Sequence, residues 1–182
     1  MSKSVALIIG SLRKDSLNRK LAKALEKLAE GRLSFHELHI GDLPHYNEEL
    51  WGNLPEPVAR LKDRLEHSDA VLAITPEYNR SYPGVIKNAL DWASRPYGAN
   101  SWAGKPAAVT GTSPGAIGTA VAQTHLKSDM LNLGMIIMQQ PEAYLQWKPE
   151  AVAADGTVTD DSLRKFLSAY VDAFEAFIAK HG

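Results

Sequence analysis

Donor side chains gather between an apolar run and a helical pattern near the start of the chain. They are Ser11, Arg13, Ser16 and Asn18. Hydroxyl, amide and guanidinium groups suit an anion, and a helix that begins here adds unpaired backbone N–H groups and a partial positive charge. The spacing therefore indicates a phosphate site. A Ser16 or Asp15 helix cap beside a solvated Arg13 would explain the same residues.

The segment lacks the glycines of the two common nucleotide loops. It has neither the Gly-Lys-Ser/Thr ending of a P-loop nor the Gly-x-Gly-x-x-Gly of a dinucleotide fold. We therefore expect one phosphate to bind here, and not a pyrophosphate or a triphosphate.

Two later segments also hold residues that suit a ligand. Tyr78 stands within 76–84, where a flat aromatic ring beside backbone amides could flank a planar group. The segment 111–118 is rich in glycine, which permits a close backbone approach. Taken singly, each segment is also explained as a proline-bounded turn or a helix cap. The case for a site is that each follows a predicted strand.

Short apolar runs alternate with helical periodicities along the chain. Strands are predicted at 5–9, 33–39, 69–75, 106–110 and 135–138, and helices at 16–30, from Pro57, from Pro83, at 117–133 and from Thr159. This alternation predicts an α/β fold with a parallel sheet. Ligands of such sheets bind beyond the carboxyl ends of the strands, where all three polar segments fall. The segment 41–57, with three prolines, Tyr46 and Trp51, is expected to be an ordered loop that is functional or at an interface.

Composition limits the other possibilities. The 182 residues suit one domain spanning 1–182, and the net charge of −1 gives no electrostatic case for nucleic acid or an anionic membrane. Cysteine is absent, which excludes thiol catalysis and thiolate metal sites. No two histidines are spaced i, i+4, so no metal centre is expected. The apolar run 5–9 is too short for a signal peptide or a membrane span, and a cytoplasmic location fits.

Several stretches, in this order, resemble the NADPH-dependent FMN reductase family of flavodoxin-like proteins, and within it the bacterial quinone and chromate reductases. They are Gly10-Ser11-Leu12-Arg13 with Ser16 and Asn18, Leu43-Pro44-His45-Tyr46-Asn47, Pro76-Glu77-Tyr78-Asn79, Pro83-Gly84-Val85-Ile86-Lys87-Asn88-Ala89-Leu90-Asp91-Trp92, Gly104-Lys105-Pro106 and Thr112-Ser113-Pro114-Gly115. The resemblance implies a flavodoxin-like three-layer sandwich, with a five-stranded parallel sheet in the order 2-1-3-4-5.

The resemblance also implies a role for each loop. The first would hold the phosphate of FMN, the second would lie along the isoalloxazine and ribityl chain, and the third would close the ring from the other side. The residues implicated are Ser11, Arg13, Ser16, Asn18, Pro76, Glu77, Tyr78, Asn79, Ser113, Pro114 and Gly115. A homodimer or tetramer is implied, with 41–57 and the helix after Ala116 as candidate contacts.

The implied activity is an FMN-dependent NAD(P)H oxidoreductase. Hydride would pass from NADH or NADPH to FMN, and electrons would then pass to a small acceptor such as a quinone or chromate. No side chain needs to act as an acid or base, so no catalytic residue is named. A flavodoxin-type electron carrier that does not oxidise NAD(P)H, and a module that has lost the flavin, are the alternatives. Arg80 stands where some family members have glycine; it could reach a nucleotide phosphate or be a plain surface residue.

Overall fold

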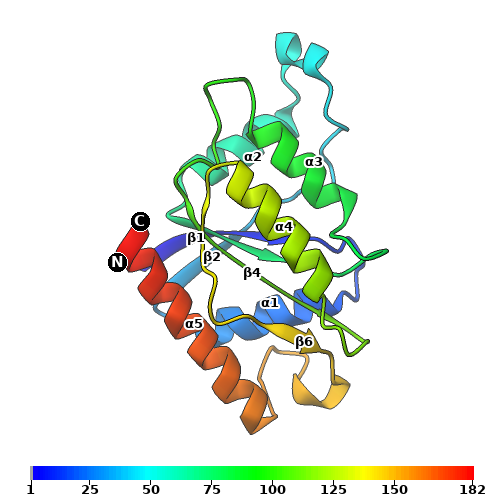
Figure 1. The fold of residues 1–182 in the computed structure, drawn as a ribbon, viewed down its shortest axis with the longest axis vertical. Coiled ribbons are helices and arrows are strands. Elements are labelled where there is room, and N and C mark those ends of the chain that lie inside the picture. Colours follow the sequence, from blue (N-terminus) through cyan, green and yellow to red (C-terminus); the bar gives the residue numbers. More distant parts are fainter. Residues whose placement is uncertain (1) are drawn as a thin grey trace.

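A parallel sheet with helices on both faces forms the centre of the structure, a computed structural model that describes residues 2–182 (Figure 1). The strands are β1 (Lys3–Ile9), β2 (Leu33–Glu37), β3 (Ala70–Ile74), β4 (Pro106–Ser113), β5 (Ile136–Ile137) and β6 (Tyr144–Gln146). The main order is β2-β1-β3-β4-β5, and every pair of strands is parallel. The predicted flavodoxin-like fold and strand order are confirmed.

Five helices make the two outer layers. They are α1 (Leu17–Leu28), α2 (Glu56–Glu66), α3 (Gly84–Ala93), α4 (Ala120–Asn132) and α5 (Asp161–His181), with short 3-10 helices η1 (Glu48–Asn53) and η2 (Pro149–Ala151). Figure 1 shows α1 and α5 on one side of the sheet and α2, α3 and α4 on the other.

The core consists of two apolar clusters, one on each face of the sheet. Successive side chains of a strand point to opposite faces, so β1 sends Val5, Leu7 and Ile9 into the cluster with α1 and α5. Ala6 and Ile8 enter the cluster beneath α2, α3 and α4. Burial on both faces explains why the central strands are unbroken apolar runs and not alternating ones.

The outer edge beyond β4 is made of two short strands in place of the single one predicted at 135–138. β5 pairs with the start of β4 and β6 pairs with its end, at Gly111–Ser113. Between them the Tyr170 hydroxyl, from α5, donates to the Val109 carbonyl at 3.2 Å. The Thr110 hydroxyl donates to the Ala143 carbonyl at 3.1 Å. Side chains thus replace part of the missing ladder.

Two helices begin later than predicted. Gly118 and Thr119 have φ of +56° and +67°, a left-handed conformation that a helix cannot contain, so α4 starts at Ala120 and not at 117. α5 starts at Asp161 because Asp160, and not Thr159, accepts the hydrogen bond from Leu163 N that caps the helix.

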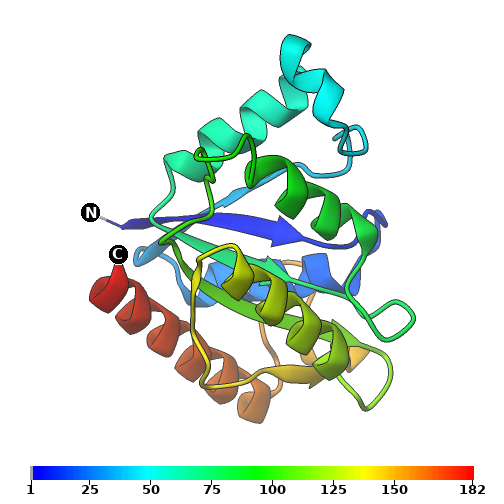
Figure 2. The ribbon, with the colours of Figure 1, turned by 45° about the horizontal axis from the view of Figure 1, so that its top comes forward.

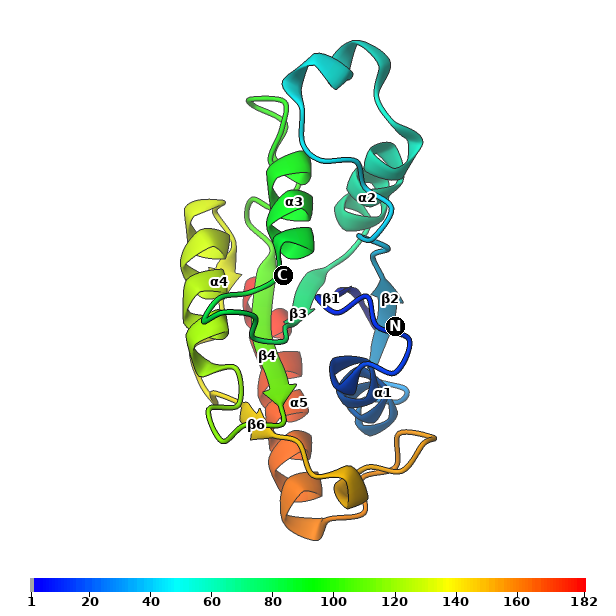
Figure 3. The same cartoon turned by 90° about the vertical axis from the view of Figure 1, so that its right-hand side faces the viewer.

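The segment 41–57 projects past α2 and α3 (cyan in Figures 1 and 3), and α3 anchors it. Asn88 and Trp92 both donate to the Pro44 carbonyl, at 2.9 and 2.7 Å, and Asn88 accepts from Tyr46 N. Tyr46 and Trp51 pack edge-on against the Trp92 ring. The motif Lys-Asn-Ala-Leu-Asp-Trp therefore holds this loop, which includes η1.

We expect Gly111→Ala to lower the free energy of unfolding by about 3 kcal/mol, at the upper end for an overpacked site. A Cβ at this position would lie 2.0 Å from the Thr75 carbonyl oxygen, so the backbone of β3 or β4 would have to move. Urea unfolding followed by circular dichroism measures the change. Gly52→Ala is the control, because its Cβ would meet nothing within 4 Å. Equal losses in both variants would contradict the close approach of β3 and β4.

Candidate functional site

The loops that follow β1, β3 and β4 lie side by side at the carboxyl edge of the sheet (right-hand end in Figure 2; Figure 3 looks onto them). The parallel register of the three strands brings their ends to one level, since Ile9 pairs with Ile74 and Ile74 with Thr110. Residues that are about 30 to 100 positions apart in the sequence therefore meet at one place.

The first loop presents backbone donors without protein acceptors. Gly10 N still bonds to Ile74 O at 2.9 Å, and residues 14–15 form a turn, but no N–H of residues 11–15, 17 or 18 donates to another backbone group within 2–182. Ser16 caps α1 by accepting from Arg19 N at 3.3 Å, and the first turn of α1 holds no acidic residue. These N–H groups and the positive end of the helix dipole therefore suit an anion.

The side chains of this loop fit the same group. Ser11 and Ser16 are both 3% exposed, and Arg13 is an exposed guanidinium at the rim. Asp15 is paired with Lys20 at 2.8 Å, so its negative charge is offset. Hydroxyls, N–H groups and a guanidinium are the donors that a phosphate monoester accepts from, so the residues present fit the phosphate of FMN.

Asn18 has a partner in the protein. Its side chain accepts from Thr112 N at 2.9 Å and donates to Thr112 O at 3.1 Å, and both residues are buried. The amide therefore ties the start of α1 to the end of β4. One amide N–H is left for a ligand, because the side chain carries two donors and uses one.

In the second loop Glu77 serves α4. Its carboxylate accepts from Val121 N and Ala122 N, each at 3.1 Å, and its side chain is 5% exposed. Thr119, at the N-cap position, makes no side-chain capping bond. Glu77 thus caps α4 from another segment, where a negative charge also offsets the helix dipole.

The turn after Glu77 is a two-residue hairpin with left-handed backbone. Tyr78 and Ser81 exchange two backbone hydrogen bonds, at 2.9 and 3.0 Å, while Asn79 and Arg80 have φ of +52° and +64°. This is the conformation that Asn-Gly favours, because both central residues need positive φ. Glycine would adopt this backbone without strain, whereas arginine here is strained by about 1 kcal/mol.

The third loop is held by β6, which sequence reasoning missed. Thr112 Oγ1 donates to Leu145 O at 2.8 Å, and Trp147 N donates to Ser113 O at 2.8 Å. Gln146 Nε2 donates to Pro114 O at 3.1 Å. This small strand fixes the segment predicted to close the site.

One cavity of about 120 Å³ lies among the three loops and brings most of the predicted site residues together. It is lined by Ser11, Arg13, Ser16, Leu17, Asn18, Pro76, Glu77, Tyr78, Thr112, Ser113 and Pro114. Asn79 and Gly115 lie outside this lining. Leu17 and Thr112 also line the cavity but were not predicted as site residues. Thr112 belongs to one of the stretches that resemble the family, so its hydroxyl could have marked it as a candidate.

The cavity is smaller than the roughly 300–1,000 Å³ of a whole-ligand pocket. It suits the phosphate end of a nucleotide, and the remainder would lie over the rim. There Tyr78 is 47% exposed, a large apolar surface without a cover among residues 2–182.

Polar groups of the second loop also bind α4. The Tyr82 hydroxyl donates to Asp129 Oδ2, and the pKa of Tyr82 is raised by burial first and by this carboxylate second. His125, exposed on α4, lies 3.3 Å from the Ser81 hydroxyl. The neutral tyrosine is thus a fixed donor, and the hairpin is braced against α4.

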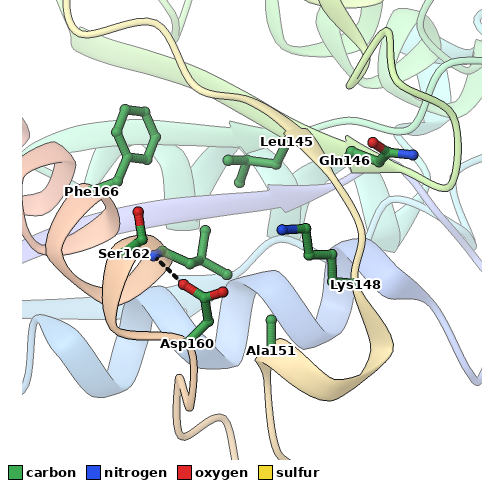
Figure 4. Close-up of a pocket in the computed structure, with 8 residues that line it drawn as sticks. Leu145, Gln146, Lys148, Ala151, Asp160, Ser162 and Phe166 are labelled. Carbon is green, nitrogen blue, oxygen red and sulfur yellow. Dashed lines mark hydrogen bonds between the residues drawn. The ribbon is translucent and has the colours of Figure 1, made fainter.

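A larger cavity, about 320 Å³, opens between the β6 segment, η2 and the first turn of α5 (Figure 4). Leu145, Leu163 and Phe166 form its apolar side, and Lys148 points into it. Asp160 faces it, but its carboxylate caps α5. None of the predicted site residues lines this cavity.

Residues 2–182 contain neither a candidate membrane span nor a metal-binding cluster. No helix in that range is long and apolar enough to cross a membrane. No three histidine or acidic side chains in it come together as a metal site would require.

Comparison with known proteins gives a consistent result. The family model of NADPH-dependent FMN reductases matches residues 4–149. A 2-hydroxy-1,4-benzoquinone reductase of a Burkholderia species is 44% identical, over 98% of this chain and 97% of its own. A quinone reductase of Pseudomonas putida is 48% identical, over 96% and 94%.

Solved structures agree with these relatives. The flavoenzyme FerB of Paracoccus denitrificans, an NAD(P)H:(acceptor) oxidoreductase, superposes with a TM-score of 0.98 at 70% identity over 99% of both chains. A WrbA-like flavodoxin from Agrobacterium tumefaciens superposes with a TM-score of 0.65 at 17% identity, which supports the fold alone.

We expect Glu77→Gln to lower the free energy of unfolding of the FMN-free protein by about 1 kcal/mol, because α4 loses its charged cap. Urea unfolding measures it. Glu56→Gln is the control. Glu56 is also a glutamate at a helix N-terminus, in the first turn of α2, but its side chain is 74% exposed, so a loss of a few tenths of a kcal/mol is expected. A variant with weaker FMN binding and unchanged FMN-free stability would mean that Glu77 acts on the flavin and not on α4.

Proposed function

Because the chain belongs to the NADPH-dependent FMN reductase family, we propose that it is an FMN-dependent NAD(P)H oxidoreductase that reduces a small acceptor of the quinone type. Chromate and other oxidised compounds are further candidate acceptors. The observation that supports this most directly is the cavity at the carboxyl edge, where a loop of unpaired backbone donors meets the two segments predicted to flank a ring.

FMN, when bound, would supply the redox chemistry between NADH or NADPH and the acceptor. The protein supplies binding and orientation. The loop 11–16 and the start of α1 would hold the phosphate, with Ser11, Ser16 and Arg13 as donors. Ser11 and Ser16 are buried and Ser16 is fixed as the cap of α1, so these two side chains would lose little conformational freedom on binding.

The other two loops would frame the flavin. Pro76, Glu77, Tyr78 and Asn79 would lie along the ring and ribityl chain, with Glu77 acting through α4. Ser113, Pro114 and Gly115 would close the far side, positioned by β6 and by Asn18. Because Tyr78 is half exposed at the rim, donor and acceptor could reach the same face in turn. No side chain is required as an acid or base.

A flavodoxin-type electron carrier is the second candidate. It would use the same phosphate site but would not oxidise NAD(P)H. The relatives, which are named as quinone reductases and as an NAD(P)H:(acceptor) oxidoreductase, favour the enzyme.

The remaining parts of the proposal concern organisation. We propose that residues 1–182 act as one FMN-binding domain in a cytoplasmic homodimer or tetramer that binds no nucleic acid. The net charge of −1 supports the last point. Support for assembly comes from 41–57, which projects from the body while its aromatic residues are anchored to Trp92.

The first test is the visible spectrum of the FMN-loaded, desalted protein, recorded anaerobically with and without nucleotide. We expect a retained two-banded flavin spectrum that bleaches with NADH or NADPH and returns on addition of 1,4-benzoquinone. A retained flavin that neither nucleotide bleaches would establish the carrier instead. Loss of flavin on desalting would contradict tight binding at the loop 11–16.

We expect Arg13→Ala to raise the Kd for FMN about 10- to 100-fold, because a charge-assisted hydrogen bond to phosphate is lost. Quenching of flavin fluorescence during titration measures it. Lys14→Ala is the control, since Lys14 is an exposed neighbouring cation that does not line the cavity. An equal rise in the Kd for FMN in both variants would mean that positive charge acts from a distance and that Arg13 does not contact the phosphate.

A further inference from the structure

Arg80 is held on a strained turn at the rim of the site although glycine would fit the backbone better. Its φ of +64° lies in the left-handed region, where a side chain other than Asn or Asp is uncommon. The hairpin is closed by two backbone hydrogen bonds and is braced on α4, so the guanidinium projects from a fixed base. Strain of this kind concentrates at functional positions.

The contact with Glu77 engages only part of the Arg80 guanidinium. Arg80 Nη1 lies 3.1 Å from Glu77 Oε1, but the Arg80 side chain remains 70% exposed. The two N–H groups of α4 bond to the other oxygen of Glu77, Oε2, so Arg80 is the partner of Oε1. This contact uses one of the five guanidinium donors, and most of the others face solvent.

The position of Arg80 beside the cavity indicates which ligand it could bind. Arg80 follows Tyr78, which lines the phosphate cavity and is exposed at its rim, and it lies beyond the cavity itself. The chain as a whole is almost neutral, so general attraction cannot draw in an anionic substrate. A nicotinamide ring placed over the rim would extend its phosphates outward, and Arg80 is the cation on this hairpin.

We infer that Arg80 binds a phosphate group of the reduced nicotinamide nucleotide, and so sets the affinity for the electron donor. The inference rests on the proposed reductase activity. The phosphate is either the diphosphate shared by NADH and NADPH or the 2′-phosphate of NADPH alone. A guanidinium can meet either with paired hydrogen bonds.

Steady-state kinetics of the FMN-loaded protein with 1,4-benzoquinone test this inference. Arg80→Gln should raise the KM for NADPH about tenfold while kcat and FMN retention stay within twofold. An equal rise for NADH identifies the diphosphate, and a rise for NADPH alone identifies the 2′-phosphate. The difference in KM between the unmodified protein and Arg80→Gln should become smaller as ionic strength increases, because salt screens exposed charges.

Arg164→Gln is the matched control. Arg164 is also an exposed arginine paired with one carboxylate three residues away, but in the first turn of α5. It should leave both KM values unchanged. Arg80→Gly adds a second signature: the melting temperature should rise by about 2–4 °C as strain is removed, while the KM rises as in Arg80→Gln.

A purely structural Arg80 predicts the reverse, with a lower melting temperature and unchanged KM values in both Arg80 variants, and that result would overturn the inference. Loss of FMN from Arg80→Gln would also overturn it, because the arginine would then serve the flavin. If the unmodified protein retains FMN but oxidises neither nucleotide, the reductase proposal and this inference both fail. If the unmodified protein turns over and Arg80→Gln has the same KM values, this inference is wrong and the reductase proposal stands.

Discussion

Two hydrogen bonds between the Asn18 amide and the backbone of Thr112 join the start of α1 to the end of β4, and the geometry of the site depends on them. They link residues 94 positions apart, both buried, so the first and third loops cannot move independently. The loop 11–16 can then stay open as a set of donors without collapsing onto protein acceptors. A binding place that is fixed before its ligand arrives loses little entropy on binding.

The second loop is coupled to the same structure through α4. Glu77 caps α4 while Tyr82 bonds to Asp129 farther along that helix, so the hairpin 78–81 and α4 form one rigid part. Residues that a family resemblance marks as flavin contacts can therefore matter for a different reason. Glu77 and Asn18 shape the loops that would touch the flavin, and Asn88 and Trp92 hold a loop that lies elsewhere.

The sequence was informative where one physical signal dominates. Unbroken apolar runs mark β1, β3 and β4 because these strands are buried on both faces, and the polar segments after them define the site. The order of the strands came from the family resemblance, since periodicity carries no information on neighbours.

The signal failed where long-range contacts decide the structure. α4 buries Gln123 and Lys127, so its apolar period is broken, and the left-handed backbone at Gly118 and Thr119 that sets its start leaves no mark in that period. Gln123 donates to Thr119 Oγ1 and to Ala143 O, contacts that no local pattern announces. β6 has three residues, too few to show the alternation of a strand. Nothing in the sequence near Asn18 indicates that its side chain bonds to Thr112.

The interrupted outer edge of the sheet affects how readily another chain can add a strand to it at high protein concentration. A long exposed edge strand offers a continuous row of N–H and C=O groups to which another chain can add a strand. Here the edge consists of two residues of β5 and three of β6, and side chains of Tyr170 and Thr110 fill in between them. A foreign strand finds no continuous ladder to extend along this edge, so the small strand that secures the third loop also protects this edge of the sheet against aggregation.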